Sequence, residues 1–135
     1  MQSNILVVED DDSIRLLLIE TLQEHALGVA IDAARDGVDA LHHATTKDYD
    51  VVILDLMMPY MTGIDFLDSL EAMISDPSVK TMSGVPSVIV ITGASPEQVP
   101  NSAIQDRFPN LVRCVLRKPL DIDVLTNCVR EYLTN

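Results

Sequence analysis

Acidic side chains follow two short, unbroken apolar segments of this sequence. Residues 5–8 (ILVV) lead into Glu9 and Asp10, and residues 51–54 (VVIL) lead into Asp55. An apolar run of this length predicts a strand that is buried on both faces of a sheet. Ligands bind at the carboxyl ends of such strands, where neighbouring strands bring their last residues together. We therefore expect the carboxylates of Glu9, Asp10 and Asp55 to share one site.

Two further apolar segments end in side chains that can bind an anion. Residues 88–91 (VIVI) precede Thr92, and residues 111–116 (LVRCVL) lead to Lys118. In a doubly wound sheet the ends of these strands lie beside the first two. The sequence thus predicts three carboxylates, one hydroxyl and one ammonium group in a single crevice.

The carboxylate of Asp55 can serve as a metal ligand, as a nucleophile or as the cap of a following helix. The cap fits poorly, because Pro59 and Gly63 delay any helix by several residues. Two carboxylates about 4 Å apart repel each other by roughly 4 kcal/mol at an effective dielectric constant of about 20, and a divalent cation removes this penalty. Ligand sets made only of oxygen favour Mg²⁺ or Mn²⁺ over zinc. We therefore expect a site for one of these two ions.

The acidic residues also restrict the kind of ligand that the site accepts. Nucleotide- and flavin-binding sites of this architecture surround a phosphate with backbone amides from glycine-rich loops. Glu9 and Asp10 would instead repel a phosphate unless a metal ion came with it. Thr92 and Lys118 could then bind the remaining phosphoryl oxygens, because phosphoryl transfer depends mainly on positioning and charge neutralisation. Asp55 is then a candidate nucleophile that would form an acyl phosphate.

Apolar residues recur at helical spacing after each strand, so strands and helices alternate five times. Such alternation predicts right-handed crossovers and a parallel sheet covered on both faces. The predicted fold class is α/β: a doubly wound, five-stranded parallel sheet of the flavodoxin-like (βα)5 type, a three-layer sandwich forming a single domain over residues 1–135. Pro100 interrupts the fourth helix, which we expect to start near Asn101 and to end by Pro109. Residues 76–86 are expected to form a polar surface loop.

The charge balance excludes several classes of partner. The chain has 21 acidic and 9 basic side chains, a formal net charge of −12. Nucleic acids and anionic membranes are bound through Lys and Arg, so we expect no direct binding to either. No segment has the pattern of a signal peptide or a membrane span, which predicts a cytoplasmic protein. Cys114 and Cys128 have neither CxxC spacing nor a nearby histidine, and we expect two reduced core thiols.

Four motifs, each after an expected strand, give the sequence a specific family resemblance. They are ILVVEDD at residues 5–11, DLMMP at residues 55–59 with Gly63, ITG at residues 91–93 and KP at residues 118–119. In this order, and across essentially the whole chain, they resemble the receiver domain of response regulators in two-component signalling. The resemblance implies a phosphorelay switch that takes its phosphoryl group from a sensor histidine kinase or a histidine phosphotransfer protein.

The resemblance implies a separate role for each residue of the acidic site. Asp55 would be the phosphoacceptor and would also contact the metal. Asp10 would bind Mg²⁺ directly, and Glu9 would act on the ion through water. Met57 would offer its backbone carbonyl to the ion. Such a domain would catalyse its own phosphorylation and dephosphorylation, which differs from the work of a conventional metabolic enzyme.

The resemblance also implies a switch. Lys118 would bridge the Asp55 carboxylate or its phosphoryl oxygen, with a cis peptide bond before Pro119. Thr92 would move toward the phosphoryl group. This movement would shift the face formed by the fourth helix, the fifth strand and the fifth helix toward a partner or an output domain.

Departures from the family pattern concern the route by which the signal leaves the site. The family usually has an aromatic residue three positions before the lysine, where this sequence has Val115. Pro100 and the long connections at residues 76–86 and 95–110 lie on the same signalling face. We therefore expect an intact phosphorylation site with an altered output route.

Two other interpretations of the sequence stay open. A degenerate receiver could act as a phosphorylation-independent binding module, which Val115 favours and the complete acidic site opposes. A Mg²⁺-dependent phosphohydrolase would usually carry a second aspartate two residues after its nucleophile, where this sequence has Met57. The sequence does not distinguish a receiver that works alone from the receiver part of a longer regulator, and it names no kinase, regulated process or oligomeric state.

Overall fold

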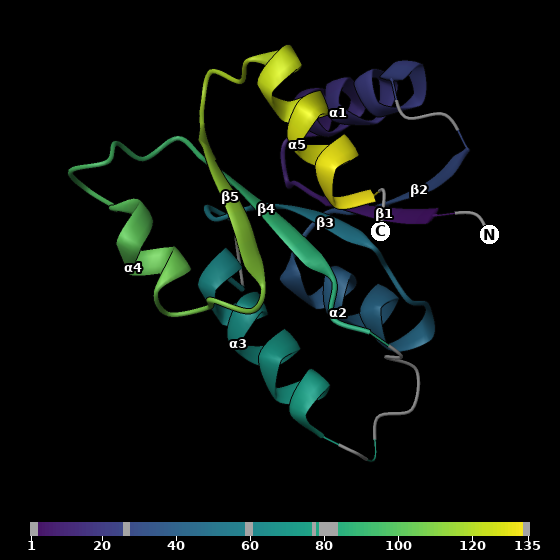
Figure 1. The fold of residues 1–135 in the computed structure, drawn as a ribbon, viewed down its shortest axis with the longest axis vertical. Helices are drawn as coiled ribbons and strands as arrows, with labels where there is room; N and C mark the ends of the chain where they lie inside the picture. The colour runs from purple at the N-terminus through teal and green to yellow at the C-terminus, as the bar shows by residue number, and fades with distance from the viewer. Residues whose placement is uncertain (1–2, 26–27, 59–60, 77, 79–83, 134–135) are drawn as a thin grey trace.

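Five strands and five helices alternate along the chain in the computed structural model (Figure 1). The structure describes residues 3–25, 28–58, 61–76, 78 and 84–133. The strands are β1 (Ser3–Val8), β2 (Val29–Ala34), β3 (Val51–Asp55), β4 (Ser87–Thr92) and β5 (Val112–Arg117). The helices are α1 (Asp12–His25), α2 (Gly37–Thr46), α3 (Gly63–Ser75), α4 (Asn101–Gln105) and α5 (Ile122–Leu133).

All five strands belong to one parallel sheet with the order β2-β1-β3-β4-β5. The chain runs outward from β1 to β2, then crosses back to the other side of β1 to add the remaining strands. The predicted doubly wound, flavodoxin-like sheet is therefore confirmed. β1 and β3 are neighbours at the point where the strand order reverses, which is where ligands bind in sheets of this kind.

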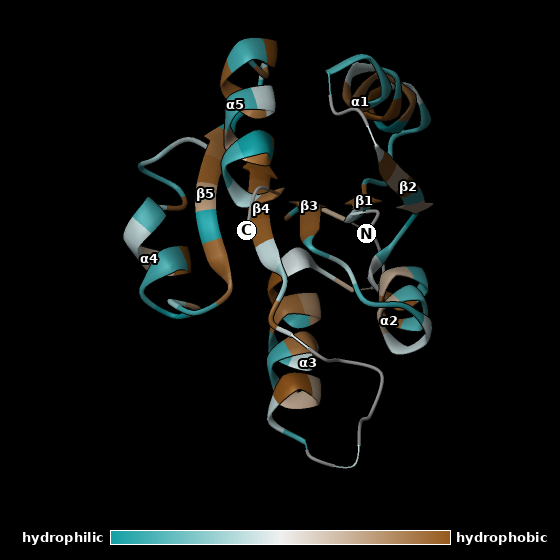
Figure 2. Ribbon diagram, turned by 45° about the vertical axis from the view of Figure 1, so that its right-hand side comes forward, coloured by the Kyte–Doolittle hydropathy of each residue, from teal (hydrophilic) through white to brown (hydrophobic). Residues whose placement is uncertain are grey.

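Helices cover both faces of the sheet. α1 and α5 lie on one face, while α2, α3 and α4 lie on the other (Figure 1). Alternate residues of each central strand enter the two cores: Ile53 packs with α1 and α5, and Leu54 packs with the helices opposite. All residues of β3 are buried, as the unbroken apolar run predicts. Figure 2 shows apolar residues concentrated in the strands and on the helix surfaces that meet them.

The fourth helix is short, as predicted. Ser95 and Gln98 exchange two capping hydrogen bonds of 3.0 and 3.2 Å, but the backbone forms only a turn there. Pro100 has no N–H with which to continue a helical ladder, so α4 begins at Asn101 and spans 5 residues. Pro59 and most of the loop expected at residues 76–86 lie outside the described residues.

Candidate functional site

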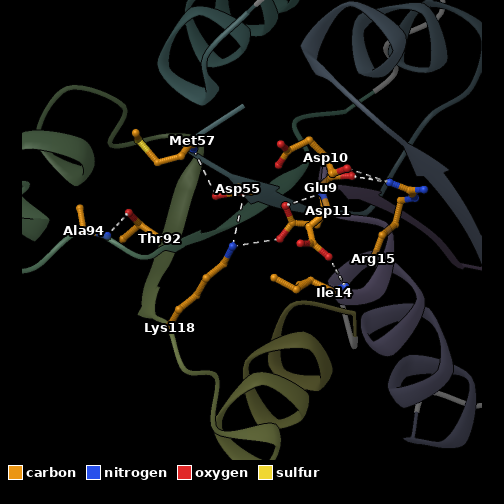
Figure 3. A network of polar contacts seen from close by, with 10 residues as sticks. All are labelled: Glu9, Asp10, Asp11, Ile14, Arg15, Asp55, Met57, Thr92, Ala94 and Lys118. Atoms are coloured by element: carbon orange, nitrogen blue, oxygen red, sulfur yellow. Dashed lines mark hydrogen bonds and ion pairs between the residues drawn. The ribbon is translucent and has the colours of Figure 1, made fainter. Parts of the chain in front are cut away.

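The carboxyl ends of β1 and β3 bring three carboxylates together. Glu9 and Asp10 directly follow β1, and Asp55 is the last residue of β3. One carboxylate oxygen of each lies within 4.8 Å of the others (Figure 3). Glu9 is fully buried, Asp55 is 2% exposed and Asp10 is exposed to solvent. A cluster of hard oxygen donors with one side open to solvent fits Mg²⁺ or Mn²⁺, which keep some of their water.

Lys118 brings a positive charge into this cluster from β5. Its backbone amide donates a hydrogen bond of 2.8 Å to the carbonyl of Thr92, which fixes the start of the segment after the strand. Its Nζ lies 3.1 Å from Oε1 of Glu9 and 3.5 Å from Oδ2 of Asp55. The peptide bond between Lys118 and Pro119 is cis, as the family resemblance implied.

Burial and mutual repulsion raise the pKa of Glu9 and of Asp10. Desolvation raises the pKa of Glu9 most, the neighbouring Asp55 raises it further, and Lys118 opposes both. Partial desolvation and the adjacent Glu9 raise the pKa of Asp10. Desolvation alone would lower the pKa of Lys118, but its contacts with Glu9 and Asp55 outweigh this and raise it. The metal-free cluster therefore holds more negative charge than one lysine balances, which favours a divalent cation.

Backbone hydrogen bonds hold the loop that follows Asp55. The amide of Met57 donates to Oδ1 of Asp55 at 3.2 Å. The amide of Leu56 donates to the carbonyl of Ile91 at 3.2 Å, and the amide of Gly63 donates to the carbonyl of Leu56 at 3.0 Å. The side chain of Met57 is 68% exposed, so it is the backbone of this residue that contacts the carboxylate.

Gly63 begins α3 at a point where no side chain fits. A β-carbon there would lie 2.7 Å from Cα of Leu56 and 2.9 Å from the carbonyl oxygen of Asp55. Because backbone atoms cannot move aside easily, Gly63→Ala is expected to lower the free energy of unfolding by about 2–3 kcal/mol. Gly93→Ala is the matched control, since a β-carbon there meets nothing within 4 Å. Urea unfolding should separate the two variants, and equal stabilities would contradict this account of the loop.

The hydroxyl of Thr92 is engaged within its own loop. Thr92 ends β4 and is fully buried, and its Oγ1 accepts a hydrogen bond of 3.1 Å from the amide of Ala94. The structure thus brings the three carboxylates together and places Lys118 against Glu9 and Asp55. It places Thr92 on the strand next to Asp55, with its hydroxyl turned toward Ala94 (Figure 3).

Arg15, which the sequence analysis did not single out, holds the acidic loop from α1. Its Nη1 donates to the carbonyl of Glu9 at 2.9 Å, and its Nη2 forms an ion pair with Asp12. The signal in the sequence is a basic residue within one helical turn of an acidic run, where its side chain can reach back. Arg15 therefore fixes the backbone from which Glu9 and Asp10 project.

Arg117, also missed by the sequence analysis, holds the loop between β4 and α4. Its guanidinium donates to the carbonyl of Ala94 at 2.9 Å, to the carbonyl of Val99 at 2.7 Å and to Oδ1 of Asn101 at 2.5 Å. Side chains two residues apart on a strand share one face, so Arg117 lies on the same side of β5 as Val115. One side chain thus connects the loop that carries Thr92 to the first residue of α4.

The fold and this cluster together define an α/β protein with a group of three carboxylates at the switch point of a doubly wound sheet. The chain belongs to the response regulator receiver domain family, which its sequence matches over residues 5–130. It is therefore a receiver domain of the kind found in two-component systems, which signal through phosphorylation.

Individual relatives agree with this assignment. Sporulation initiation phosphotransferase F of Bacillus subtilis is 29% identical over 133 residues, which cover 98% of this chain and 95% of that protein. Transcriptional activator protein IrlR of Burkholderia pseudomallei is 40% identical over 73 residues, which cover 54% of this chain and 31% of that protein. The receiver domain of Francisella response regulator 1452 is 28% identical and superposes with a TM-score of 0.74 over 97% of this chain and 96% of that one.

Membership of this family indicates which kinds of metal ion and protein partner receiver domains in general bind. Receiver domains bind Mg²⁺ at an acidic pocket, and this chain has an acidic group formed by Glu9, Asp10 and Asp55. They interact with histidine kinases or phosphotransfer proteins. The helices in the described part of the chain are too short or too polar to cross a membrane.

Proposed function

We propose that Asp55 accepts a phosphoryl group from a phosphorylated histidine of a sensor kinase or phosphotransfer protein. One carboxylate oxygen of Asp55 forms a bond to phosphorus while the phosphorus–nitrogen bond of the donor breaks. The imidazole nitrogen leaves with the electron pair and is then protonated by solvent. The observation that carries the proposal is the buried Asp55 carboxylate, placed between the ammonium of Lys118 at 3.5 Å and the carboxylates of Glu9 and Asp10.

The neighbouring residues would position and neutralise the transferred group. Glu9, Asp10, Asp55 and the backbone carbonyl of Met57 would hold Mg²⁺, which supplies charge neutralisation at the phosphoryl oxygens when bound. Lys118, whose raised pKa keeps it protonated at neutral pH, would bind an oxygen next to Asp55. The lysine and the cation would also offset the negative charge that Asp55 and the incoming phosphoryl group bring together.

The donor chemistry can be tested with phosphoramidate, a small donor that carries the same phosphorus–nitrogen bond as phosphohistidine. With Mg²⁺ present, the full chain should acquire a phosphoryl group that ³¹P NMR detects as an acyl phosphate. Asp55→Asn should acquire none. Asp68→Asn, which removes an exposed carboxylate on α3, is the matched control and should behave as the unaltered chain. Labelling of all three proteins, or of none, would contradict the proposal.

Phosphorylation would turn the Thr92 hydroxyl toward the phosphoryl group and change the contacts of the loop that follows β4. The phosphoryl group adds about −1.5 to −2 charges and three acceptor oxygens. Oγ1 of Thr92 accepts from the amide of Ala94, so its O–H is free to donate once the side chain rotates toward the phosphoryl group and away from Ala94, whose carbonyl is held by Arg117. New charge-assisted bonds from Thr92 and Lys118, at about 1.5–3 kcal/mol each, approach the roughly 5.5 kcal/mol that inverts a two-state equilibrium. Arg117 would pass the change on to Asn101 at the start of α4.

Arg117→Ala is expected to loosen the loop between β4 and α4 before any phosphorylation. Losing hydrogen bonds to the carbonyls of Ala94 and Val99 should speed hydrogen exchange of the Gln98 and Val99 amides about tenfold or more. Arg113→Ala, an exposed arginine on the same strand, is the control and should leave exchange unchanged. Phosphorylation should alter exchange in this loop in the unaltered chain and much less in Arg117→Ala. If the Gln98 and Val99 amides of unphosphorylated Arg117→Ala exchange at the same rate as in the unaltered chain, this output route is refuted.

The acyl phosphate on Asp55 is expected to hydrolyse slowly. Met57 and Ala94, each two residues past a site residue, carry no group that could orient an attacking water. Met57→Asn places a carboxamide at this exposed position and should speed phosphate release about tenfold. Met57→Leu is the control and should release phosphate at the original slow rate. Rapid loss from the unaltered chain, or equal rates in the two variants, would contradict this expectation.

A further inference from the structure

Two cysteines that are 14 residues apart in the sequence meet on the face of the sheet covered by α1 and α5. Cys114 lies in β5 and Cys128 lies in α5, and their sulfur atoms are 3.1 Å apart. Both are free thiols and both are half-buried. A covalent disulfide has a sulfur–sulfur distance of about 2.05 Å, so roughly 1 Å of movement separates this pair from a bond.

The packing of the two elements holds the thiols in this position. Cys114 is paired with Ile89 of β4, so its strand is bound into the sheet. Cys128 directly precedes Val129, which is buried together with Leu125 in the core between α5 and the sheet. The two sulfur atoms therefore face each other from elements that are both packed into the fold.

We propose that Cys114 and Cys128 form a reversible intramolecular disulfide when the protein meets hydrogen peroxide. In the first step a sulfur attacks one peroxide oxygen, the oxygen–oxygen bond breaks, and water leaves with the thiol proton, giving a sulfenic acid. In the second step the other sulfur attacks the sulfenic sulfur, the sulfur–oxygen bond breaks, and a second water leaves with the second thiol proton. Each thiol loses one hydrogen, and two electrons pass to the peroxide.

Cys128 is the thiol that reacts first. In the structure the S–H of Cys114 is directed at the sulfur of Cys128, so the proton of Cys114 is engaged between the two sulfur atoms. Burial, the neighbouring Cys128 and the charge of Glu131 raise the pKa of the Cys114 thiol to about 12, which keeps its proton available for this bond. Cys114 then serves as the resolving thiol.

The disulfide would tie α5 to β5 around the segment that carries Lys118. A covalent loop of this length restricts the unfolded chain and is expected to raise the melting temperature by about 10 °C. Its formation does not depend on the phosphoryl chemistry proposed for Asp55. The Asp55→Asn variant should therefore form it as readily as the unaltered chain.

The full chain, first reduced and then treated with hydrogen peroxide, tests the proposal. Its intact mass should fall by the mass of two hydrogen atoms, and N-ethylmaleimide should label neither of its two cysteines. Dithiothreitol should restore both labels and reverse the rise in melting temperature. Persisting labels, added oxygen located on either cysteine by peptide mapping, or a product cross-linked between chains would overturn the proposal.

Single variants test the order of reaction without relying on the disulfide itself. Cys114→Ser should trap Cys128 as a sulfenic acid that dimedone labels. Cys128→Ser should show little dimedone labelling at the same peroxide concentration. The reverse pattern would overturn the assignment of Cys128 as the first thiol to react. Circular dichroism of the reduced variants checks that both are folded.

Discussion

Lys118→Met is expected to lower the free energy of unfolding of the metal-free protein by about 3 kcal/mol at neutral pH. The substitution leaves the buried carboxylates of Glu9 and Asp55 without the ammonium that lies 3.1 and 3.5 Å away. Removing one partner from a buried ion pair costs more than the pair itself contributes, because the remaining charge stays desolvated. Urea unfolding with a chelator present measures the loss, and added Mg²⁺ should recover part of it.

Lys47→Met is the matched control for this prediction. Lys47 pairs with Asp32 at 3.0 Å, but both side chains are about one third exposed, so the loss should stay below about 1 kcal/mol. The deficit of Lys118→Met should also shrink as the pH falls below neutrality. The pKa of Glu9 is already raised, so the folded state takes up protons before the unfolded state does and gains stability as the pH decreases. Equal losses in the two variants would contradict the proposed charge balance.

In contrast to Lys118→Met, Asp10→Asn should raise the free energy of unfolding of the metal-free protein. Asp10 lies exposed beside Glu9 and its pKa is raised, so removing its charge should stabilise the protein slightly, by less than about 1 kcal/mol. The same change should weaken Mg²⁺ binding at least tenfold, because one of three carboxylate ligands is lost. Unfolding measured at a Mg²⁺ concentration about one hundred times the dissociation constant should show roughly 2.7 kcal/mol of stabilisation in the unaltered chain and clearly less in the variant.

Asp12→Asn removes a nearby charge at the first residue of α1 and serves as the control for Asp10→Asn. Its side chain is 87% exposed and pairs with Arg15 outside the carboxylate cluster, so Mg²⁺ should stabilise this variant as it does the unaltered chain. Loss of Mg²⁺ stabilisation in Asp12→Asn, or its persistence in Asp10→Asn, would show that the cation binds elsewhere.

The sheet and its acidic edge could be predicted because their signals are local. Unbroken apolar runs at residues 5–8 and 51–54 can be buried only between two layers of helices, and a residue that directly follows such a run must lie at the carboxyl end of the strand. The sequence therefore placed Glu9, Asp10 and Asp55 together at the carboxyl edge of the sheet. Pro100 in the same way limited α4 by removing a single hydrogen-bond donor.

The contacts that the sequence did not predict depend on side-chain reach across the fold. Arg117 adjoins the lysine motif, but nothing local shows that its guanidinium spans from Ala94 to Asn101. The cysteines have no spacing typical of a pair, and they meet because α5 packs back on the sheet. The direction of the Thr92 hydroxyl depends on a rotamer, which sequence spacing does not encode.

The central claim, that Asp55 is a Mg²⁺-dependent phosphoacceptor, is tested most directly by intact-protein mass spectrometry after incubation with acetyl phosphate. The unaltered chain and Asp55→Asn are each compared with and without Mg²⁺. The account predicts a phosphoryl adduct in one of the four samples, the unaltered chain with Mg²⁺. An adduct on Asp55→Asn would mean that another residue is the nucleophile. Absence of any adduct would contradict the claim and favour a receiver that binds its partners without phosphorylation.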